Sequence, residues 1–563
     1  MLESSPLSLW HLWMETDEHA NVEWSARLAA GNWADVPAYR AYFSWQESYG
    51  PPEAWERWYQ RNAYFSGPLY PYGLAILRRL FGAPFVPARF LHLLFAAVAA
   101  ACLARAVQVV AGDFLRKPPE TGGKKRGPDR DPSRAPFVAA LAAGLACGLY
   151  GPLVFHDFFL YRDGPVAHVS TILLAWPLIV RGRSDENGES PPKGEEGGAA
   201  RGGWMRGASG AFLLGLLGGL AMLLKQTTAP LALASLYVLS REPLPASPSR
   251  KTPGSRQRGR SLLFGLLGLA IPLGVLAARN VAAGVPPLTF DTRQAIGLAW
   301  GNGFGADATT APPPDMKEIL DAAGGSTLKT ARLVLEGYRD EPLELPKLFL
   351  KKLATFFNSF EVPDNANFYF FRDRLPVLRF LPVFACLLGP GLVGLLAALA
   401  RGMLRRDEGL LAFVGILTPL AACLLVQTTS RYRVGAIGPL ALGCGLFFLF
   451  SFEAIRVRRL RDASFLGLAA GALSLVPLLP PVIYAARHRY ADTIVYATLV
   501  EGRLGPDAAA AEIRRYVEEA KDDRLYEAAV QVLHRWAKTG DRSGSLVEPE
   551  GIAPPGRRLR DRN

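Results

Sequence analysis

Apolar stretches that could cross a lipid bilayer recur along most of this 563-residue chain, and charged connectors separate them. The candidates are 86–110, 136–153, 166–181, 208–224, 228–240, 262–279, 379–400, 409–427, 433–452 and 463–485. A straight span needs about 20 residues, so several are short, and the pair flanking Lys225 could form one broken hairpin. The recurrence predicts an all-α, polytopic membrane helical bundle of about 10 spans. It excludes an ordinary soluble enzyme, a disordered chain and a disulfide-stapled secreted domain.

The basic residues of the connectors indicate which side of the membrane each connector faces, because cytoplasmic loops carry an excess of Lys and Arg. If each stretch crosses once, four basic groups fall on one face with the mixed-charge connector 182–207. We therefore expect that face to be cytoplasmic. The four groups are Arg116, Lys117, Lys124, Lys125, Arg126, Arg130 and Arg134; Arg241, Arg250, Lys251, Arg256, Arg258 and Arg260; Arg401, Arg405 and Arg406; and Arg456, Arg458, Arg459 and Arg461.

Two long segments and the C-terminal tail then fall on the external face. Both long segments are rich in aromatic residues, which favours ordered structure over a disordered loop. The tail has helical periodicity at 507–521 and 523–537, which predicts two packed helices. The expected domains are a first external loop with an acidic motif and interfacial helices, 1–85; the N-terminal part of the bundle, 86–279; a second large external loop, 280–378; the C-terminal part of the bundle, 379–486; and a soluble helical tail, 487–563.

The net charge and the positions of the cysteines argue against a nucleic-acid partner and against cysteine-based metal or redox sites. The chain has 63 Lys and Arg against 50 Asp and Glu, and its net charge of +13 would suggest nucleic-acid binding in a soluble protein. Most of the excess lies in connectors, so membrane topology explains it and no nucleic-acid partner is expected. The five cysteines lie inside apolar runs and lack the spacing of metal or redox sites.

Two adjacent carboxylates, Asp17 and Glu18, open a helical pattern that closes at Gly31. Thr16 or Asp17 suits the N-cap position, and acidic residues at a helix start suit the helix dipole. One interpretation is therefore purely structural. The other is that Asp17 or Glu18 is a general base or a metal ligand at the membrane surface, where desolvation raises the pKa of a carboxylate.

Further ionisable residues lie at the external ends of the apolar stretches. Asp157 either forms an ion pair that fixes a turn or belongs to a functional site. Lys225 either extends its charge toward the membrane surface or neutralises a phosphate. Arg431 and Arg433 flank Tyr432, and they either anchor the chain at the interface or bind an anion.

These charges share the external surface with aromatic residues. Tyr70 lies at the start of a pattern typical of a half-buried interfacial helix, and the preceding Trp55-Glu56-Arg57-Trp58-Tyr59 adds surfaces that suit sugars or isoprenyl chains. The sequence has no P-loop, dinucleotide-binding glycine motif, nucleophile elbow or zinc-protease motif. Carboxylates and cations on one surface suit a lipid-phosphate substrate presented from the outer leaflet.

Several of these motifs resemble those of GT-C glycosyltransferases, and they occur in the same order. Asp17-Glu18 and Gly67-Pro68-Leu69-Tyr70-Pro71 resemble the first external loop, and Phe155-His156-Asp157, Lys225 and Ser430-Arg431-Tyr432-Arg433 follow. Residues 357–372 resemble the second external loop of a bacterial branch related to protein O-mannosyltransferases and the lipid A aminoarabinose transferase (glycosyltransferase family 39-like). Members of this branch usually carry a transmembrane helix before the Asp-Glu pair, whereas residues 1–16 contain no spanning run and no signal peptide is predicted.

The resemblance implies inverting transfer of a sugar from a polyprenyl-phosphate donor to a lipid, glycan or protein acceptor. It places the active site on the periplasmic or extracellular face of a multi-pass plasma (inner) membrane protein. No cofactor is required, and a divalent metal is compatible with this chemistry. The expected catalytic residues are Asp17, Glu18 and Asp157, and the expected substrate-binding residues are Lys225, Arg431, Arg433, Tyr70 and Tyr432.

Other function classes remain open from the sequence. Within enzymes, the alternative is a ligase that moves a whole lipid-linked oligosaccharide. Outside enzymes, it is a lipid-sugar transporter or flippase, which would place charged residues at mid-span and show internal repeats. The sequence shows neither feature. An inactive scaffold that acts through its tail is a third alternative.

Overall fold

The computed structural model describes ten stretches of the chain, and every regular element in them is a helix. The fold of the described residues is therefore all-α, and the predicted fold class is confirmed. The described residues are 6–12, 16–33, 46, 49–60, 62–116, 134–182, 208–241, 255–308, 312–480 and 490–520.

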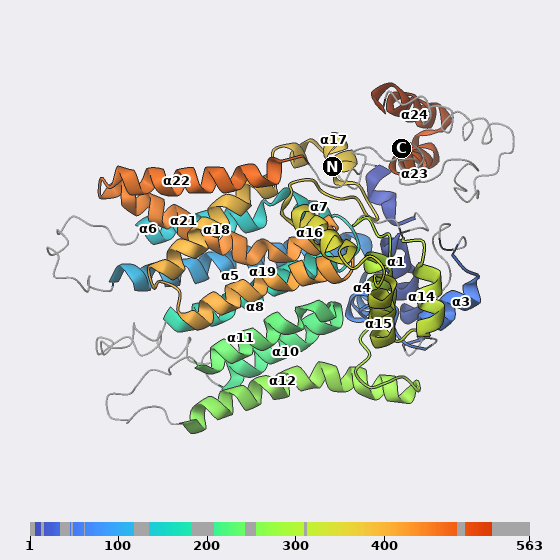
Figure 1. Ribbon diagram of the computed structural model, residues 1–563, viewed down its shortest axis with the longest axis horizontal. Coiled ribbons are helices and arrows are strands. Elements are labelled where there is room, and N and C mark those ends of the chain that lie inside the picture. Colours follow the sequence, from blue (N-terminus) through green and yellow to red (C-terminus); the bar gives the residue numbers. More distant parts are fainter. Residues whose placement is uncertain are drawn as a thin grey trace.

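Long apolar helices run side by side along the length of the molecule (Figure 1). Each predicted apolar stretch corresponds to one of these helices or, for 136–153, to a bent pair. The helices are α5 (Phe85–Arg116), α6 (Arg134–Gly148), α7 (Gly151–Asp157), α8 (Asp163–Gly182), α10 (Ala208–Leu224), α11 (Ala229–Arg241), α12 (Ser255–Ala282), α18 (Phe384–Ala400), α19 (Arg406–Leu425), α21 (Ile437–Arg456) and α22 (Leu460–Leu475).

Among the described residues, five helices are long and apolar enough to cross a membrane, and the bent pair α6–α7 would make a sixth. The apolar helices α10 and α18 are shorter. Two predicted boundaries are wrong next to prolines. Helix α18 starts at Phe384, after Pro382, rather than at 379, and a 3-10 turn, η5 (Pro376–Arg379), lies ahead of it. Helix α22 ends at Leu475, where η7 (Val476–Leu478) follows with Pro477.

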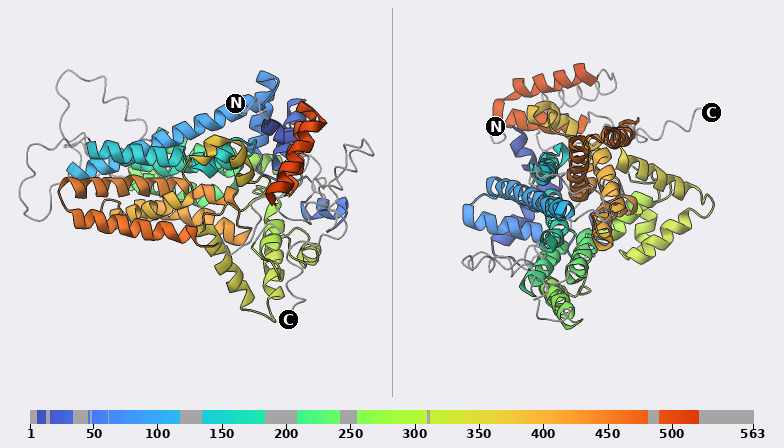
Figure 2. Two further views of the ribbon diagram at one scale, coloured as in Figure 1. Left: turned by 90° about the horizontal axis from the view of Figure 1, so that it is seen from above. Right: turned by 90° about the vertical axis from the view of Figure 1, so that its left-hand side faces the viewer.

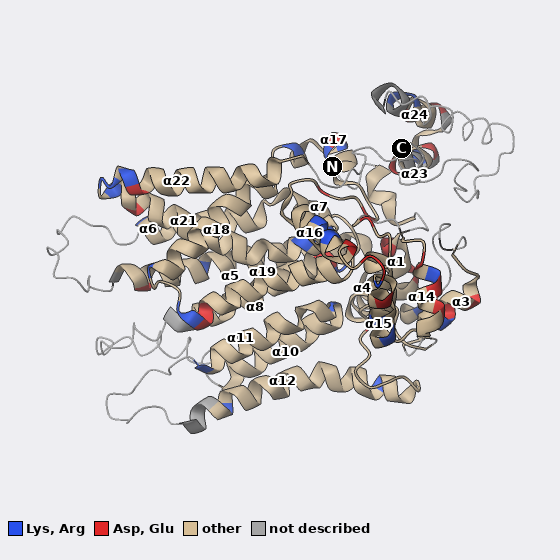
Figure 3. Ribbon diagram, in the orientation of Figure 1, with Lys and Arg blue, Asp and Glu red and all other residues tan. Residues whose placement is uncertain are grey.

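Charged residues gather at the two ends of this bundle, and its middle is almost free of them (Figure 3). The helix ends that lead into the four predicted basic connectors lie together at one end (Figure 1). This arrangement is the one expected if each apolar stretch crosses the membrane once. At the other end, α10 and α11 are joined through Lys225 and the 3-10 turn η4 (Gln226–Thr228).

Shorter helices of the two long external segments gather at that second end (Figure 2). Trp24, Trp55 and Trp58 lie buried there in one core with Met316 and Leu320, so residues 1–85 and 280–378 pack against each other. The helices are η1 (Pro6–Leu12), α1 (Asp17–Ala29), α3 (Pro52–Trp58), α4 (Leu69–Phe81), α13 (Arg293–Asn302), α14 (Met316–Ala323), α15 (Thr327–Gly337), α16 (Glu344–Phe357) and α17 (Phe368–Arg374), with α20 (Ser430–Arg433) and η6 (Val434–Ala436).

The tail contributes two more helices at the same end, α23 (Tyr490–Leu504) and α24 (Pro506–Ala520). Helix α24 matches the helix predicted at 507–521. Helix α23 was not predicted. The second predicted tail helix, 523–537, lies outside the described residues.

Candidate active site

A cavity of about 980 Å³ lies where the apolar bundle meets the external helices. Asp17, Lys225, Arg431 and Tyr432 line it, and all four were predicted site residues. Its remaining walls come from the start of α11, from α13, from the end of α19 and from α23. The fold thus brings into one cavity residues that are hundreds of positions apart in the chain.

Asp17 reaches the cavity because it is the first residue of α1. Thr16 caps this helix, and its Oγ1 accepts a hydrogen bond from the backbone N–H of His19 at 3.1 Å. The predicted N-cap is therefore confirmed. The helix ends at Ala29, and Gly31 follows with a left-handed φ of 111° that suits glycine.

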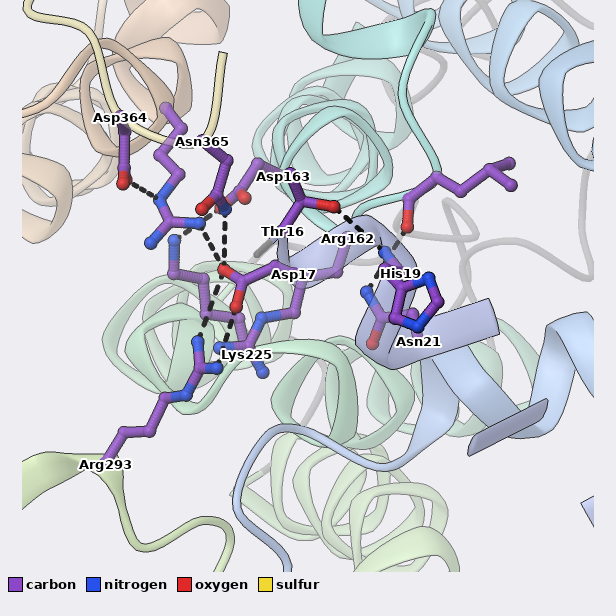
Figure 4. Close-up of polar contacts among 12 residues, drawn as sticks. Thr16, Asp17, His19, Asn21, Arg162, Asp163, Lys225, Arg293, Asp364 and Asn365 are labelled. Atoms are coloured by element: carbon purple, nitrogen blue, oxygen red, sulfur yellow. Dashed lines mark hydrogen bonds and ion pairs between the residues drawn. The ribbon is translucent and has the colours of Figure 1, made fainter. Parts of the chain in front are cut away.

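Three hydrogen-bond donors converge on the Asp17 carboxylate (Figure 4). Arg293 Nη2 lies 2.8 Å from Oδ1, and Arg431 Nη1 lies 2.6 Å from Oδ2. Asn365 Nδ2 donates to Oδ2 at 2.9 Å. Arg431 also pairs through Nε with Asp364, at 2.6 Å. The carboxylate is thus held between two guanidinium groups that come from different parts of the chain.

These contacts decide the protonation state of Asp17. Burial alone would raise its pKa, but the charges and hydrogen bonds of Arg293 and Arg431 outweigh burial and hold the pKa well below the usual range. The expectation that desolvation raises the pKa of this carboxylate is therefore wrong for Asp17. Asp17 is ionised throughout the physiological pH range.

Lys225 lies beside this cluster in the turn between α10 and α11. Its Nζ donates to Asp163 Oδ1 at 2.7 Å and lies 4.0 Å from the centre of the Tyr432 ring. The turn packs tightly against Gly67, where a Cβ would collide with the carbonyl oxygen of Leu224. This close approach explains why a glycine stands at 67. Lys225 is therefore held in place by an ion pair, an aromatic ring and backbone contact.

Glu18, the neighbour of Asp17, does not line the cavity. It is fully buried, and its Oε1 accepts a hydrogen bond from the backbone N–H of Leu160 at 2.9 Å. Burial raises the pKa of Glu18 to about 7 against the opposing charge of Arg89. For this residue the expected rise in pKa is confirmed. Its contacts tie α1 to the segment that follows α7.

Asp157 and Tyr70 also lie away from the cavity, in a buried polar chain. His168 Nε2 lies 3.0 Å from both carboxylate oxygens of Asp157. His92 links the backbone carbonyl of Asp157, at 3.2 Å, to the Tyr70 hydroxyl, at 3.1 Å. The side-chain partner of Asp157 is thus a histidine of α8. The catalytic role predicted for Asp157 and the substrate-binding role predicted for Tyr70 stay predictions.

Arg433 does not line the cavity, although Arg431 two residues earlier does. Arg433 is 3% exposed, and its Nη2 pairs with Glu361 at 2.5 Å. It also donates to the backbone carbonyls of Phe356 and Asn358. The anion that Arg433 contacts is therefore a carboxylate of the protein itself. Arg431 and Arg433 thus lie in different environments, one in the cavity wall and the other in a buried ion pair.

One wall of the cavity is apolar. It is formed by the end of α10, the start of α11 and the end of α19 in the bundle, together with the external helix α13. A wall of this kind beside a cationic cluster suits a ligand with a charged head and a hydrocarbon chain. The apolar residues of this wall include Met222, Pro230, Ile296, Trp300, Ala422 and Leu425.

The sequence-based prediction missed Arg293, which makes the bidentate contact with Asp17. Arg293 starts α13, inside a long external segment without a recognisable motif at that point. Asp163 and Asn365 also received no role from the sequence. A metal was left open, and no group of three or more metal-ligating side chains lies together in the described part of the chain. The groups around Asp17 are hydrogen-bond donors instead.

No family model and no curated protein match this sequence. Two solved structures are similar in arrangement, both crystal structures of the Archaeoglobus fulgidus oligosaccharyltransferase. The structure tethered to an acceptor peptide with the NVT sequon is 15% identical, with a TM-score of 0.32, over 80% of this chain and 50% of that chain. The apo form is 12% identical, with a TM-score of 0.34, over 90% and 59%. The chain thus spans a half to three-fifths of their length, and scores this low do not establish a shared fold.

Proposed function

We propose that this protein is a membrane glycosyltransferase that transfers a sugar from a polyprenyl-phosphate donor to an acceptor on the external face, with inversion. One observation carries the proposal: a carboxylate, Asp17, and the cations Lys225, Arg293 and Arg431 share a cavity with an apolar wall. The apolar wall suits the polyprenyl chain, and the cations suit the phosphate. The Asp17 carboxylate suits removal of the proton from the acceptor hydroxyl.

In the proposed reaction, the acceptor hydroxyl oxygen attacks the anomeric carbon of the donor sugar. Asp17 takes the hydroxyl proton as the new C–O bond forms. The bond between the anomeric carbon and the phosphate oxygen breaks, and its electron pair leaves with the lipid phosphate. Arg431, Arg293 and Lys225 stabilise the charge that develops on that phosphate. The low pKa of Asp17 then favours release of the proton to solvent.

The decisive experiment incubates the purified protein in detergent with radiolabelled polyprenyl-phosphate sugars and candidate acceptors. We expect release of polyprenyl phosphate together with a labelled product of inverted anomeric configuration. A flippase would give no product in detergent, because it breaks no bond. Transfer only from a lipid-linked oligosaccharide would indicate the ligase instead.

Two arginine variants test the phosphate role. Arg431→Lys keeps the charge but loses the planar fork, so the KM for the donor should rise by about tenfold or more. Arg433→Lys serves as the matched comparison, because Arg433 does not line the cavity. It should lower thermal stability and leave the donor KM unchanged. Equal donor KM values in wild type and Arg431→Lys would remove the phosphate assignment.

A further inference from the structure

Helix α16 carries a buried charge that the proposed reaction does not use. Lys352 is 0% exposed, and it does not line the cavity. Its ammonium group has three N–H donors and no acceptor. Burying such a charge is costly unless the protein satisfies its donors. Lys352 therefore depends on partners inside the fold.

Three oxygen atoms surround the Lys352 ammonium. Its Nζ donates to the backbone carbonyls of Leu424, at 2.8 Å, and Val426, at 2.9 Å, and to Asn302 Oδ1, at 2.9 Å. Asn302 Nδ2 donates in turn to the carbonyl of Leu425 at 2.7 Å. The last carbonyls of a helix have no partner within that helix, and a positive charge there complements the helix dipole. Lys352 and Asn302 together thus cap the end of α19.

The capped end of α19 is also the place where α13 meets it. Gly301 of α13 lies against the Val426 carbonyl, and a Cβ at Gly301 would collide with that oxygen. A Cβ at Gly297 would lie 2.9 Å from the Val426 side chain. Asn302, which contacts the Lys352 ammonium, is the last residue of α13. Lys352 therefore joins α13 and α19 at one point.

Both joined helices lead to the arginines that hold Asp17. Arg293 begins the helix that Asn302 ends. Arg431 follows α19 after a short segment whose residues 427–430 are all buried. The chain is thus continuous and packed between the Lys352 contacts and each arginine. A shift at Lys352 would therefore move the two guanidinium groups relative to each other.

We infer that Lys352 is a positioning residue for the phosphate site of the proposed reaction: it fixes the spacing between Arg293 and Arg431. The inference rests on the proposed function, in which these arginines bind the donor phosphate. The protein already uses all three ammonium hydrogens of Lys352, so none is left for a ligand. Displacing a binding group by about 1 Å costs up to about 10²-fold in rate, so a distant residue of this kind affects the site strongly.

The test measures phosphate binding separately from turnover. Purified wild type and Lys352→Met are titrated in detergent with radiolabelled polyprenyl phosphate, well below the unfolding temperature of each protein. Methionine keeps the approximate length of the side chain and removes all three donors. The Kd should rise about tenfold, because the two guanidinium groups lose their matched positions. Lys351→Met, at the neighbouring lysine outside the cavity, is the matched control and should bind as wild type does.

A milder change at the same point keeps the test independent of the Lys352 variant. Asn302→Ala removes one acceptor of the ammonium and the donor to Leu425, and it should also raise the Kd. Asn358→Ala is its matched control, because Asn358 is a buried asparagine that donates to the backbone carbonyl of Leu479 and does not line the cavity. It should lower the unfolding temperature and leave the Kd unchanged. Equal Kd values for Asn302→Ala and Asn358→Ala would contradict the inference.

A double variant tests the route through the arginine. If Lys352 acts through Arg431, Lys352→Met should weaken binding less in the Arg431→Lys background than in wild type. The same fold-change in both backgrounds would show that Lys352 acts independently of Arg431 and would overturn the inference.

The outcomes separate the two proposals. A wild type that binds polyprenyl phosphate but transfers no sugar would overturn the proposed function, and the binding test of Lys352 would still apply. A lower unfolding temperature of Lys352→Met with an unchanged Kd would overturn the inference alone, because Lys352 would then be a structural cap only. A wild type that does not bind polyprenyl phosphate would overturn both.

Discussion

The Asp17 carboxylate has a pKa well below the usual range, and two guanidinium groups hold it in a fixed position. Asp17→Asn removes its charge with little change of shape, and the Thr16 cap remains. If Asp17 is the general base, turnover should fall by about 10²–10⁴. Membrane yield should persist, because the substitution keeps the shape of the side chain. Glu23→Gln, on the same helix but outside the cavity, is the control and should keep normal turnover. Near-normal turnover of Asp17→Asn in the transfer assay would exclude the role.

Glu18 makes a different prediction, about pH and stability. Its pKa in the folded protein is about 7, above the value of about 4.3 in an unfolded chain. The folded state therefore holds this proton more tightly, and the resulting stability is present below the unfolded pKa and is lost as pH rises through about 7. Glu18→Gln should remove this dependence, which amounts to at most about 4 kcal/mol.

Thermal unfolding in detergent at pH 5 and pH 8 measures the effect. Wild type and Glu18→Gln should unfold at similar temperatures at pH 5. At pH 8 the variant should unfold at the higher temperature. A constant difference between the two proteins across this range would show that Glu18 does not titrate as a buried carboxyl.

At the scale of elements, the position of the Lys225 turn depends on the absence of a side chain at Gly67. A Cβ at Gly67 would collide with the carbonyl oxygen of Leu224 and lie 2.8 Å from Arg162 Nη1. Gly67→Ala should therefore displace the turn, lower stability by about 1–3 kcal/mol and raise the donor KM. Gly73→Ala on α4 is the matched control, because a Cβ there meets no atom within 4 Å. Equal unfolding temperatures for the two variants would contradict the close-packing argument.

The helices of the bundle could be predicted from the sequence because each depends on a local property, its run of apolar residues. The boundaries next to Pro382 and Pro477 could not, because an apolar run continues through a residue at which a helix starts or ends. Helix α23 also escaped prediction. Its buried face is defined by contacts with η1, far away in the chain, and not by a strong period of its own.

At the scale of the whole molecule, the candidate site depends on contacts between distant parts of the chain. Asp17 meets Arg293 across 276 residues and Arg431 across 414. The charged residues themselves could be selected from the sequence, since each lies at the external end of an apolar stretch. Their partners could not. Nothing in the local sequence distinguishes Arg431, which faces the cavity, from Arg433, which pairs with Glu361.

The arrangement of the bundle also predicts which surfaces face which side of the membrane. The basic helix ends lie at one end and the cavity lies at the other, so α15 should be external and the start of α22 cytoplasmic. Leu328 is 82% exposed on α15, and Arg461 is exposed near the start of α22. With the native cysteines replaced by alanine, a cysteine at 328 should react with a membrane-impermeant maleimide in intact cells. A cysteine at 461 should react only after permeabilisation, and the reverse pattern would place the cavity on the cytoplasmic side.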